Sequence, residues 1–264
     1  MKNVFETLTL DQIKELAPSA FQTQQKVGLS EHYVHIPTDR VINDMISLGW
    51  EPCDAKEIKA RKSTTVGYQR HMIKFFNPSI EIEGNDGDMV YPQIVLTNSH
   101  DGLSSFKFQI GLFRLVCSNG LVIADQSYGD FKLRHMGYTF AELQTKINEA
   151  VDSFPALVEK MDQFSQTELS EEQMVDFAHK AIKLRFNNEK SNTFIDIDGL
   201  LNIERKEDEG NDLWSVYNRV QEKIIGGGFR YGNKNRKART IKNFNQDLKI
   251  NEALWELAAE YVSC

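Results

Sequence analysis

The chain has 264 residues, of which 41% are hydrophobic and 26% are charged, and its formal net charge is −7. This composition is that of an ordinary soluble globular protein, and no run approaches the roughly 20 apolar residues that a membrane-spanning helix needs. With a net negative charge the molecule as a whole is not an obvious polyanion binder, so any nucleic-acid surface must be a local patch. The N-terminus lacks the apolar core of a secretory signal, and Cys53, Cys117 and Cys264 have no CxxC spacing. We therefore expect a cytoplasmic protein with reduced thiols and no membrane contact.

The N-terminal third is expected to mix helices with a strand. Thr9 and Gln12 have the spacing of a capping box, which predicts a helix that ends near Pro18. Three later segments are predicted from cap residues and apolar patterns: a strand over residues 32–36, a helix capped by Thr38 that ends near residue 48, and a short helix from Asp54 to about residue 61.

The middle of the chain is expected to be rich in strands. The predicted strands cover residues 69–76, 80–83, 91–97 and 105–116. In the last of them the apolar side chains alternate with Lys107 and Gln109, which predicts one buried face and one face exposed to water. The strands 91–97 and 105–116 are predicted to pair antiparallel around a turn that contains His100.

From Thr139 onward the pattern is helical. Apolar residues at steps of three and four predict a long helix to about Phe164, with a kink at Pro155. Further helices are predicted from Ser170, from Leu213 to the glycines at 226–228, and over residues 248–261.

This order of elements predicts an α+β fold with a central, mostly antiparallel sheet flanked by helices and a helical C-terminal half. The expected organisation is an N-terminal helical segment over residues 1–29 and a single α+β domain over residues 30–264. Within that domain, residues 30–138 are sheet-rich and residues 139–264 are helix-rich.

A polar motif, Thr-Asn-Ser-His-Asp-Gly at residues 97–102, lies between the two central strands. These residue types favour tight turns because they tolerate positive φ and bond their own backbone. The alternative is a catalytic site at the rim of the sheet, with Asn98, His100 and Asp101 as candidate acid–base residues. Ser99 beside His100 is not a dyad by adjacency, since such groups are assembled in space. Cys117 is interpreted as a small buried residue.

No metal or cofactor is predicted. The six histidines show neither HExxH nor a Cys/His cluster, and a turn at Gly199 explains Asp196 and Asp198 as well as a metal site does. The run of glycines at 226–228 is interpreted as a helix cap and hinge. It lacks the GK[ST] of a phosphate-binding loop and does not match a dinucleotide fingerprint.

A basic segment is the strongest local anomaly in this acidic chain. No acidic residue occurs over residues 223–246, where aromatic residues such as Phe229 and Phe244 are interleaved with cations. Cations neutralise phosphates and aromatic rings stack on bases, so the pattern favours nucleic-acid binding by a mobile arm. The alternative is a solvated loop that pairs with the acidic residues 204–212. The candidate binding residues are Arg230, Tyr231, Lys234, Arg236, Lys237, Arg239 and Lys242.

Several motifs together resemble a family of phage- and plasmid-type proteins, the domain of unknown function family 932. The resemblance runs from about Ser30 to the C-terminus. It rests on residues 96–102, 114–120, 211–218 with Gln221 and Glu222, and 251–255. The matching positions are Asn98, His100, Asp101, Arg114, Cys117, Asn119, Trp214, Asn218, Glu222, Arg236, Arg239 and Asn251. Trp214 and Trp255 are expected to be core residues.

The resemblance implies a bacterial host cell and a mobile genetic element, and it assigns no reaction. Three functions stay open. The first is an accessory protein that binds nucleic acid, such as single strands during replication or recombination. The second is an enzyme, a hydrolase or nuclease, centred on Asn98, His100 and Asp101. The third is an interaction with a host or phage protein, such as one that counters host defence.

Overall fold

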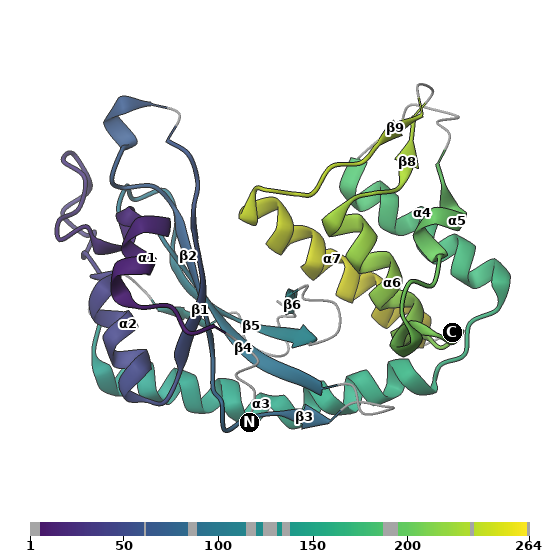
Figure 1. Ribbon diagram of the computed structural model, residues 1–264. Coiled ribbons are helices and arrows are strands. Elements are labelled where there is room, and N and C mark those ends of the chain that lie inside the picture. The colour runs from purple at the N-terminus through teal and green to yellow at the C-terminus, as the bar shows by residue number, and fades with distance from the viewer. Residues whose placement is uncertain are drawn as a thin grey trace. The chain divides into compact units, whose positions relative to one another are not determined.

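The computed structural model describes residues 6–60, 62–83, 89–114, 120–123, 131–133, 138–186, 195–232 and 235–262 (Figure 1). The contacts divide the chain into two compact units, and the division falls inside the long helix α3 (Phe140–Gln166), between Phe154 and Pro155. Apart from two short internal stretches, unit 1 comprises the residues up to Phe154 and unit 2 those from Pro155. Unit 1 contains the sheet and unit 2 is mainly helical, so the predicted α+β class is confirmed.

An antiparallel sheet forms the centre of unit 1. The strands lie in the order β1-β2-β4-β5-β6, while β3 also pairs with β4, and β7 with β5. As predicted, β4 and β5 pair antiparallel across the His100 turn, with Leu96 opposite Phe108. The strands are β1 (Glu51–Glu57), β2 (His71–Phe76), β3 (Ile82–Glu83), β4 (Met89–Asn98), β5 (Phe106–Arg114), β6 (Gly120–Ile123) and β7 (Phe131–Leu133).

The predicted wet face of the sheet is only partly present: Lys107 is half-buried, and the prediction is wrong for Gln109. Phe106, Phe108 and Ile110 are buried as expected, but Gln109 on the opposite face is only 5% exposed. Gln109 pairs with Val95 of β4, which pairs in turn with Lys74 of β2, and Lys74 is 8% exposed. The alternation of apolar and polar residues along a strand therefore predicts which side chains share a face, but it does not predict whether the polar face is exposed to water.

Short helices at the N-terminus of unit 1 contact the first strand and one another. In α1 (Leu10–Leu16) the predicted capping box is present, with the Gln12 amide donating to the Thr9 hydroxyl and the Gln12 side chain accepting from the Thr9 amide. Contacts join α1 to β1, and α2 (Thr38–Ser47) to both β1 and the 3-10 turn η1 (Pro18–Phe21). A second 3-10 turn, η2, spans Ser63–Thr65.

Three of the N-terminal predictions are wrong. Residues 32–36 form no strand, and the segment from Asp54 to Glu57 is part of β1 rather than a helix. Thr38 is the first residue of α2 and does not cap it, because its hydroxyl is engaged with side chains of the sheet. In each case a local signal was overridden by a partner from a distant part of the chain.

Unit 2 is built from helices packed around aromatic side chains. Contacts join α4, α6 and α7 to one another, and α5 to α4 and α6. Tyr217 lies at the centre, with the rings of Phe164, Trp214 and Trp255 within 6.3 Å of it. Trp214 and Trp255 are buried, as predicted. The elements are α4 (Glu171–Phe186), α5 (Ile197–Leu201), the 3-10 turn η4 (Lys206–Asp208), α6 (Leu213–Gly226), β8 (Arg230–Tyr231), β9 (Arg236–Lys237) and α7 (Phe244–Val262).

The helical stripe predicted for α3 is confirmed, since its apolar positions from Leu143 to Phe164 are buried. In α4, Ile182 is buried and Leu184 is exposed. Among the described residues, no helix combines the length and the apolar character that crossing a membrane requires.

Candidate functional site

The polar motif at the end of β4 lies inside unit 1 and not at its surface. Asn98, Ser99 and His100 each have no exposed surface, whereas Asp101 is half-buried. Asp101 accepts hydrogen bonds from the Ser99 hydroxyl at 2.7 Å and from the Leu103 amide at 3.0 Å. The motif is therefore the expected structured turn, and two of its three candidate catalytic residues have no access to solvent.

A hydrogen-bonded network links Asn98 to His71, the first residue of β2. The His71 Nε2 lies 2.9 Å from the Thr38 hydroxyl, and the Asn98 side-chain amide donates to that same hydroxyl at 3.0 Å. On the other side of the ring, Nδ1 lies 3.1 Å from the Gln69 carbonyl and 3.1 Å from the Ser19 hydroxyl. We call His71, Thr38, Asn98 and Ser19 the histidine network.

These partners assign the protonation of His71. A backbone carbonyl only accepts, so Nδ1 carries the proton and donates to the Gln69 carbonyl. Nε2 then accepts from the Thr38 hydroxyl, whose oxygen is left to accept from Asn98. Burial lowers the pKa of the His71 imidazole to about 4. Together with this lowered pKa, the network favours a neutral His71 at physiological pH.

Two further histidines lie against this network. The His100 ring is 5.2 Å from the His71 ring and 4.4 Å from the His35 ring, measured between centroids. The three come from separate segments of the sequence, and the spacing of the histidines gave no signal that they meet. His71 uses both ring nitrogens in the network, and within the described part of the chain no group of three or more His, Cys, Asp or Glu could hold a metal ion.

Nearby ionisable groups are also held in their neutral forms. Burial, and then the charge of Asp101, raises the pKa of Tyr33 to about 12, and its hydroxyl donates to the Ser99 carbonyl at 3.1 Å. Elsewhere in the sheet, burial raises the pKa of the half-buried Cys53 thiol of β1 to about 12. Groups that stay neutral and bonded to one another fix side chains in place; the arrangement suits a rigid interior better than proton transfer to a substrate.

The basic segment of unit 2 forms a short hairpin. In it β8 pairs antiparallel with β9, with Arg230 opposite Lys237 and Tyr231 opposite Arg236. We call residues 227–242 the basic hairpin; of the predicted binding residues, Lys234 lies outside the described residues. Asp196 and Asp198 flank it at α5, where Asp196 accepts from the Gly199 amide at 2.9 Å as a helix cap. The turn interpretation of these two residues is confirmed for Asp196.

The base of the hairpin is fastened to α6, so the prediction of a free arm on a glycine hinge is wrong. Gly227 has φ +81°, and a Cβ there would lie 2.5 Å from the Ala238 carbonyl oxygen. The Gly228 amide donates to that oxygen at 2.9 Å, and the Ile241 amide donates to the Ile225 carbonyl at 2.9 Å. Arg185, which sequence reasoning missed, donates to the carbonyls of Ile224 and Arg239.

The aromatic residues of the segment serve mainly this attachment. Phe229 and Phe244 are 2% and 3% exposed, so neither ring is available to stack on a base, contrary to the sequence interpretation. Tyr231 is half-buried, and its ring stacks on that of Phe186 at 4.3 Å. Apolar burial anchors the hairpin and leaves its cations outside.

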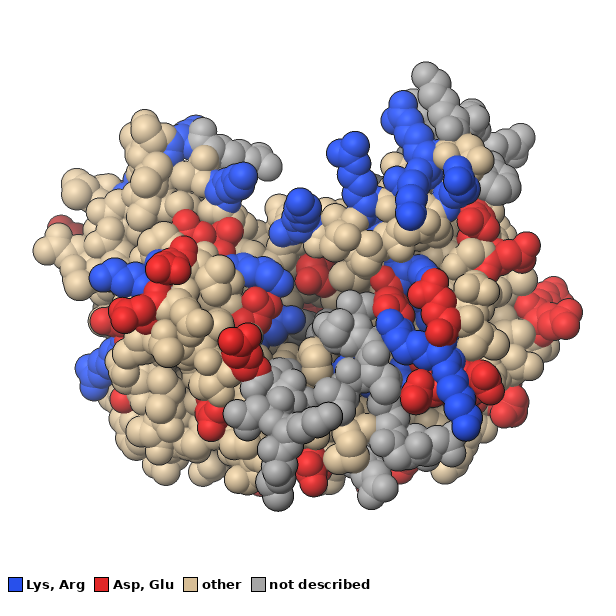
Figure 2. All heavy atoms as spheres, viewed as in Figure 1, with Lys and Arg blue, Asp and Glu red and all other residues tan. Residues whose placement is uncertain are grey.

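The described cations of the hairpin all face solvent. None of them forms an ion pair with a carboxylate of the described residues. These residues are Arg230, Arg236, Lys237, Arg239 and Lys242. Figure 2 shows Lys and Arg side chains gathered where Figure 1 places β8 and β9.

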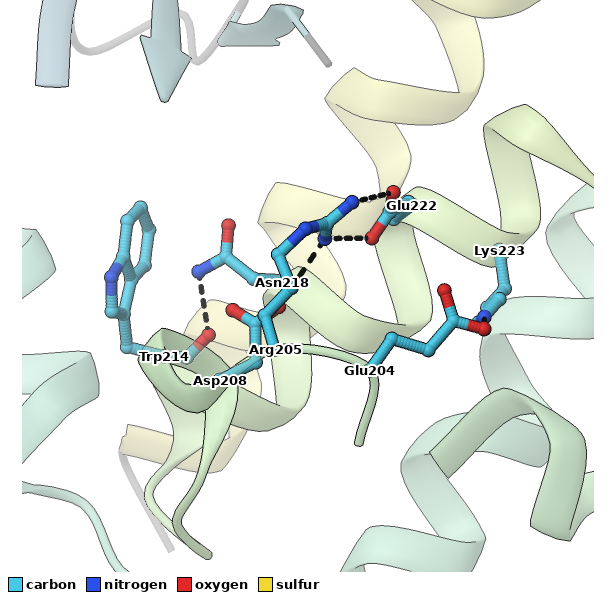
Figure 3. Close-up of polar contacts among 7 residues, drawn as sticks. All are labelled: Glu204, Arg205, Asp208, Trp214, Asn218, Glu222 and Lys223. Atoms are coloured by element: carbon cyan, nitrogen blue, oxygen red, sulfur yellow. Dashed lines mark hydrogen bonds and ion pairs between the residues drawn. The ribbon is translucent and has the colours of Figure 1, made fainter. Parts of the chain in front are cut away.

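The acidic residues 204–212 have partners of their own (Figure 3). Arg205 forms a two-pronged ion pair with Glu222 and also lies 3.5 Å from Asp208, which is 2% exposed. Glu204 pairs with Lys223, and this hydrogen bond lowers the pKa of the carboxyl. The alternative in which the acidic segment neutralises the basic hairpin is therefore wrong for the described residues.

Two depressions adjoin the hairpin, and they differ in charge. One, of about 610 Å³, is lined by Lys237, Arg239 and Lys242 together with Thr240 and small residues. The other, of about 480 Å³, is lined by three carboxylates and two lysines: Asp196, Asp198, Glu204, Lys223 and Lys237. Gly228 and Lys237 border both. We call them the basic depression and the acidic depression.

Other positions of the sequence motifs have structural roles. The Asn218 side chain donates to the Trp214 carbonyl at 2.7 Å (Figure 3). Asn251 has no exposed surface and accepts from the Gln221 side chain at 2.7 Å. Arg114 is 4% exposed, while Cys117 and Asn119 lie outside the described residues. Of the motif residues with described side chains, Arg236 and Arg239 are the exposed ones.

With the fold and these two regions described, the chain can be compared with known proteins. The family model described as Domain of unknown function (DUF932) matches residues 28–255, so the chain belongs to this family. It is similar to the UPF0380 proteins YafZ and YfjQ of Escherichia coli strain K12. Each is 30% identical over 256 residues, which cover 95% of this chain and 90% of the relative. No solved structure matches the chain.

Proposed function

We propose that this protein binds nucleic acid through the basic hairpin, as an accessory protein of a phage- or plasmid-type mobile element. The observation that carries the proposal is the set of five exposed hairpin cations without a carboxylate partner among the described residues. Cations placed in this way are free to replace the counterions of a phosphate backbone, and that release drives binding. The mobile-element setting is part of the proposal, and its support is what the resemblance to phage- and plasmid-type proteins implies.

The structure adds a reason for the charges to be kept together. A two-stranded hairpin alone in water is only marginally stable. Here the hairpin is attached to the rest of unit 2 by the buried side chains of Phe229, Ala238 and Phe244 and by the Arg185 hydrogen bonds. Like charges on a short hairpin repel one another, so the arrangement lowers stability unless an anion is bound. A cluster of cations that the fold keeps close together despite their mutual repulsion is typical of a polyanion-binding site.

The test is the salt dependence of oligonucleotide binding. Each phosphate contact contributes roughly 0.7–0.9 to the slope of log affinity against log salt concentration. Replacing Arg236, Lys237 and Arg239 together with alanine should therefore flatten the slope by roughly 2–3 units. Fluorescence anisotropy across a salt series measures this, on single-stranded and duplex oligonucleotides.

A matched control removes the same charge elsewhere. Lys14, Lys59 and Lys62 are exposed and belong to unit 1, so their triple alanine variant has the same net charge as the hairpin variant. It should leave the slope close to that of the wild type. An unchanged slope in the hairpin variant, equal flattening in the control, or no binding by the wild-type protein at low salt would contradict the proposal.

A further inference from the structure

The two depressions give the hairpin a basic side and an acidic side. The basic depression has three cations on its walls and no carboxylate. The acidic depression has Asp196, Asp198 and Glu204, and of its two lysines Lys223 is paired with Glu204. A phosphate chain is attracted to the first side and repelled from the second. Of the two depressions, the basic one is therefore the favourable place for a bound polyanion.

Small residues share the lining of the basic depression with the cations. They are Gly226, Gly228 and Ala238, and Gly226 and Gly228 have no neighbouring atom within 4 Å of the place where a Cβ would lie. With a volume of about 610 Å³, the depression has room for a sugar–phosphate unit beside the charged groups. The hydroxyl of Thr240, also in its lining, is committed to the Gly226 carbonyl at 2.8 Å.

We propose that the basic depression holds the backbone of a single-stranded nucleic acid in preference to a duplex. The inference rests on the proposed function and names the class of ligand. A single strand is flexible and can bend into a recess, whereas a duplex is stiff over about 150 base pairs and keeps its phosphates on the outside of a rod. A duplex also carries a second phosphate strand, which would come close to the carboxylates of the acidic side.

Gly226 offers a way to fill the depression without altering its charge. It is the last residue of α6, is exposed, and has open space around the Cβ position. A leucine fits a helix end by propensity and would occupy the recess; it also lacks the ring that could stack on a base. Alanine at the same position is the matched control, because it changes the backbone preference equally but fills almost no volume.

The experiment compares Gly226→Leu with Gly226→Ala and the wild type in anisotropy titrations. The probes are a single-stranded DNA, a single-stranded RNA of the same sequence, and the DNA duplex, all at one salt concentration. We expect the wild type to bind the single strands more tightly than the duplex. Gly226→Leu should lose single-strand affinity on the order of tenfold while duplex affinity and melting temperature hold. Gly226→Ala should behave as the wild type.

The outcomes separate the two proposals. Equal loss for all three probes, or no loss for the single strands, overturns the single-strand inference even where the alanine triple variant still flattens the salt slope. Unequal loss for DNA and RNA supports the inference and identifies which sugar the depression accepts. Absence of binding to every probe overturns the proposed function itself.

Discussion

The histidine network of unit 1 and the basic hairpin of unit 2 both overlap sequence motifs that suggest a functional site, but the surroundings of their polar side chains are opposite. His71, Thr38 and Asn98 are fully buried and bonded to one another. The hairpin cations are exposed and have no carboxylate partner among the described residues. Polar residues that satisfy each other stabilise a fold, whereas charges left unpaired at a surface are available to a ligand.

Acidic pH should have the largest effect, and it should act on unit 1. Burial holds the pKa of folded His71 at about 4, against about 6.5 in an unfolded chain. The unfolded state therefore binds the proton more tightly, and His71 favours folding fully only above about pH 6.5. That contribution should be lost as the pH falls from about 6.5 to 4, by about 3 kcal/mol.

Chemical unfolding across this pH range measures the loss, and nuclear magnetic resonance titration of the His71 ring reports its pKa in the folded protein. A His71→Gln variant should show a shallower pH dependence, because it lacks the titrating group. A folded-state pKa near 6.5 would show that His71 is not held neutral by burial. The contrast with the hairpin would then weaken.

Removing the Asn98 side chain should have the next largest effect. Asn98→Ala deletes the donor to Thr38 and the acceptor of the Ser99 amide, which lies 2.8 Å from the Asn98 oxygen. Leaving these buried groups without partners should lower the free energy of unfolding by about 2 kcal/mol. The folded Asn98→Ala variant should bind oligonucleotides with an affinity within about twofold of the wild type, because the hairpin belongs to the other unit. A variant with unchanged stability but lost binding would make the polar motif a functional site.

Much of the fold was predictable because its signals are local. The capping box at Thr9, the apolar stripe of α3, and the turn between β4 and β5 each involve residues close in sequence, and all three were predicted. The N-terminal errors arose where a local signal competed with tertiary pairing. Asp54 and Glu57 have the spacing of a helix cap, yet the segment pairs with β2. Propensity of this kind is weak against the hydrogen bonds of a sheet.

The amino-acid composition of the candidate site could be predicted from the sequence, but its tertiary contacts could not. The absence of acidic residues over 223–246 marked the basic segment, because charge segregation is visible in sequence, but the segment was interpreted as a mobile arm and not as a hairpin. Its attachment was not visible, since Arg185 reaches the Ile224 and Arg239 carbonyls from another helix. The meeting of His35 and His100 was hidden for the same reason: strand register and loop paths bring together rings from distant segments.

Lysine footprinting on the nucleic-acid complex tests the central claim most directly. The protein is acetylated with a limiting reagent, with and without a single-stranded oligonucleotide, and modification at each lysine is quantified by mass spectrometry. Lys237 and Lys242 line the basic depression, so both should be protected in the complex. Lys14, Lys59 and Lys62 are exposed in unit 1 and should be modified equally in both states. Protection confined to unit 1, or none at Lys237 and Lys242 under conditions where the oligonucleotide is bound, would contradict the assignment of binding to the hairpin.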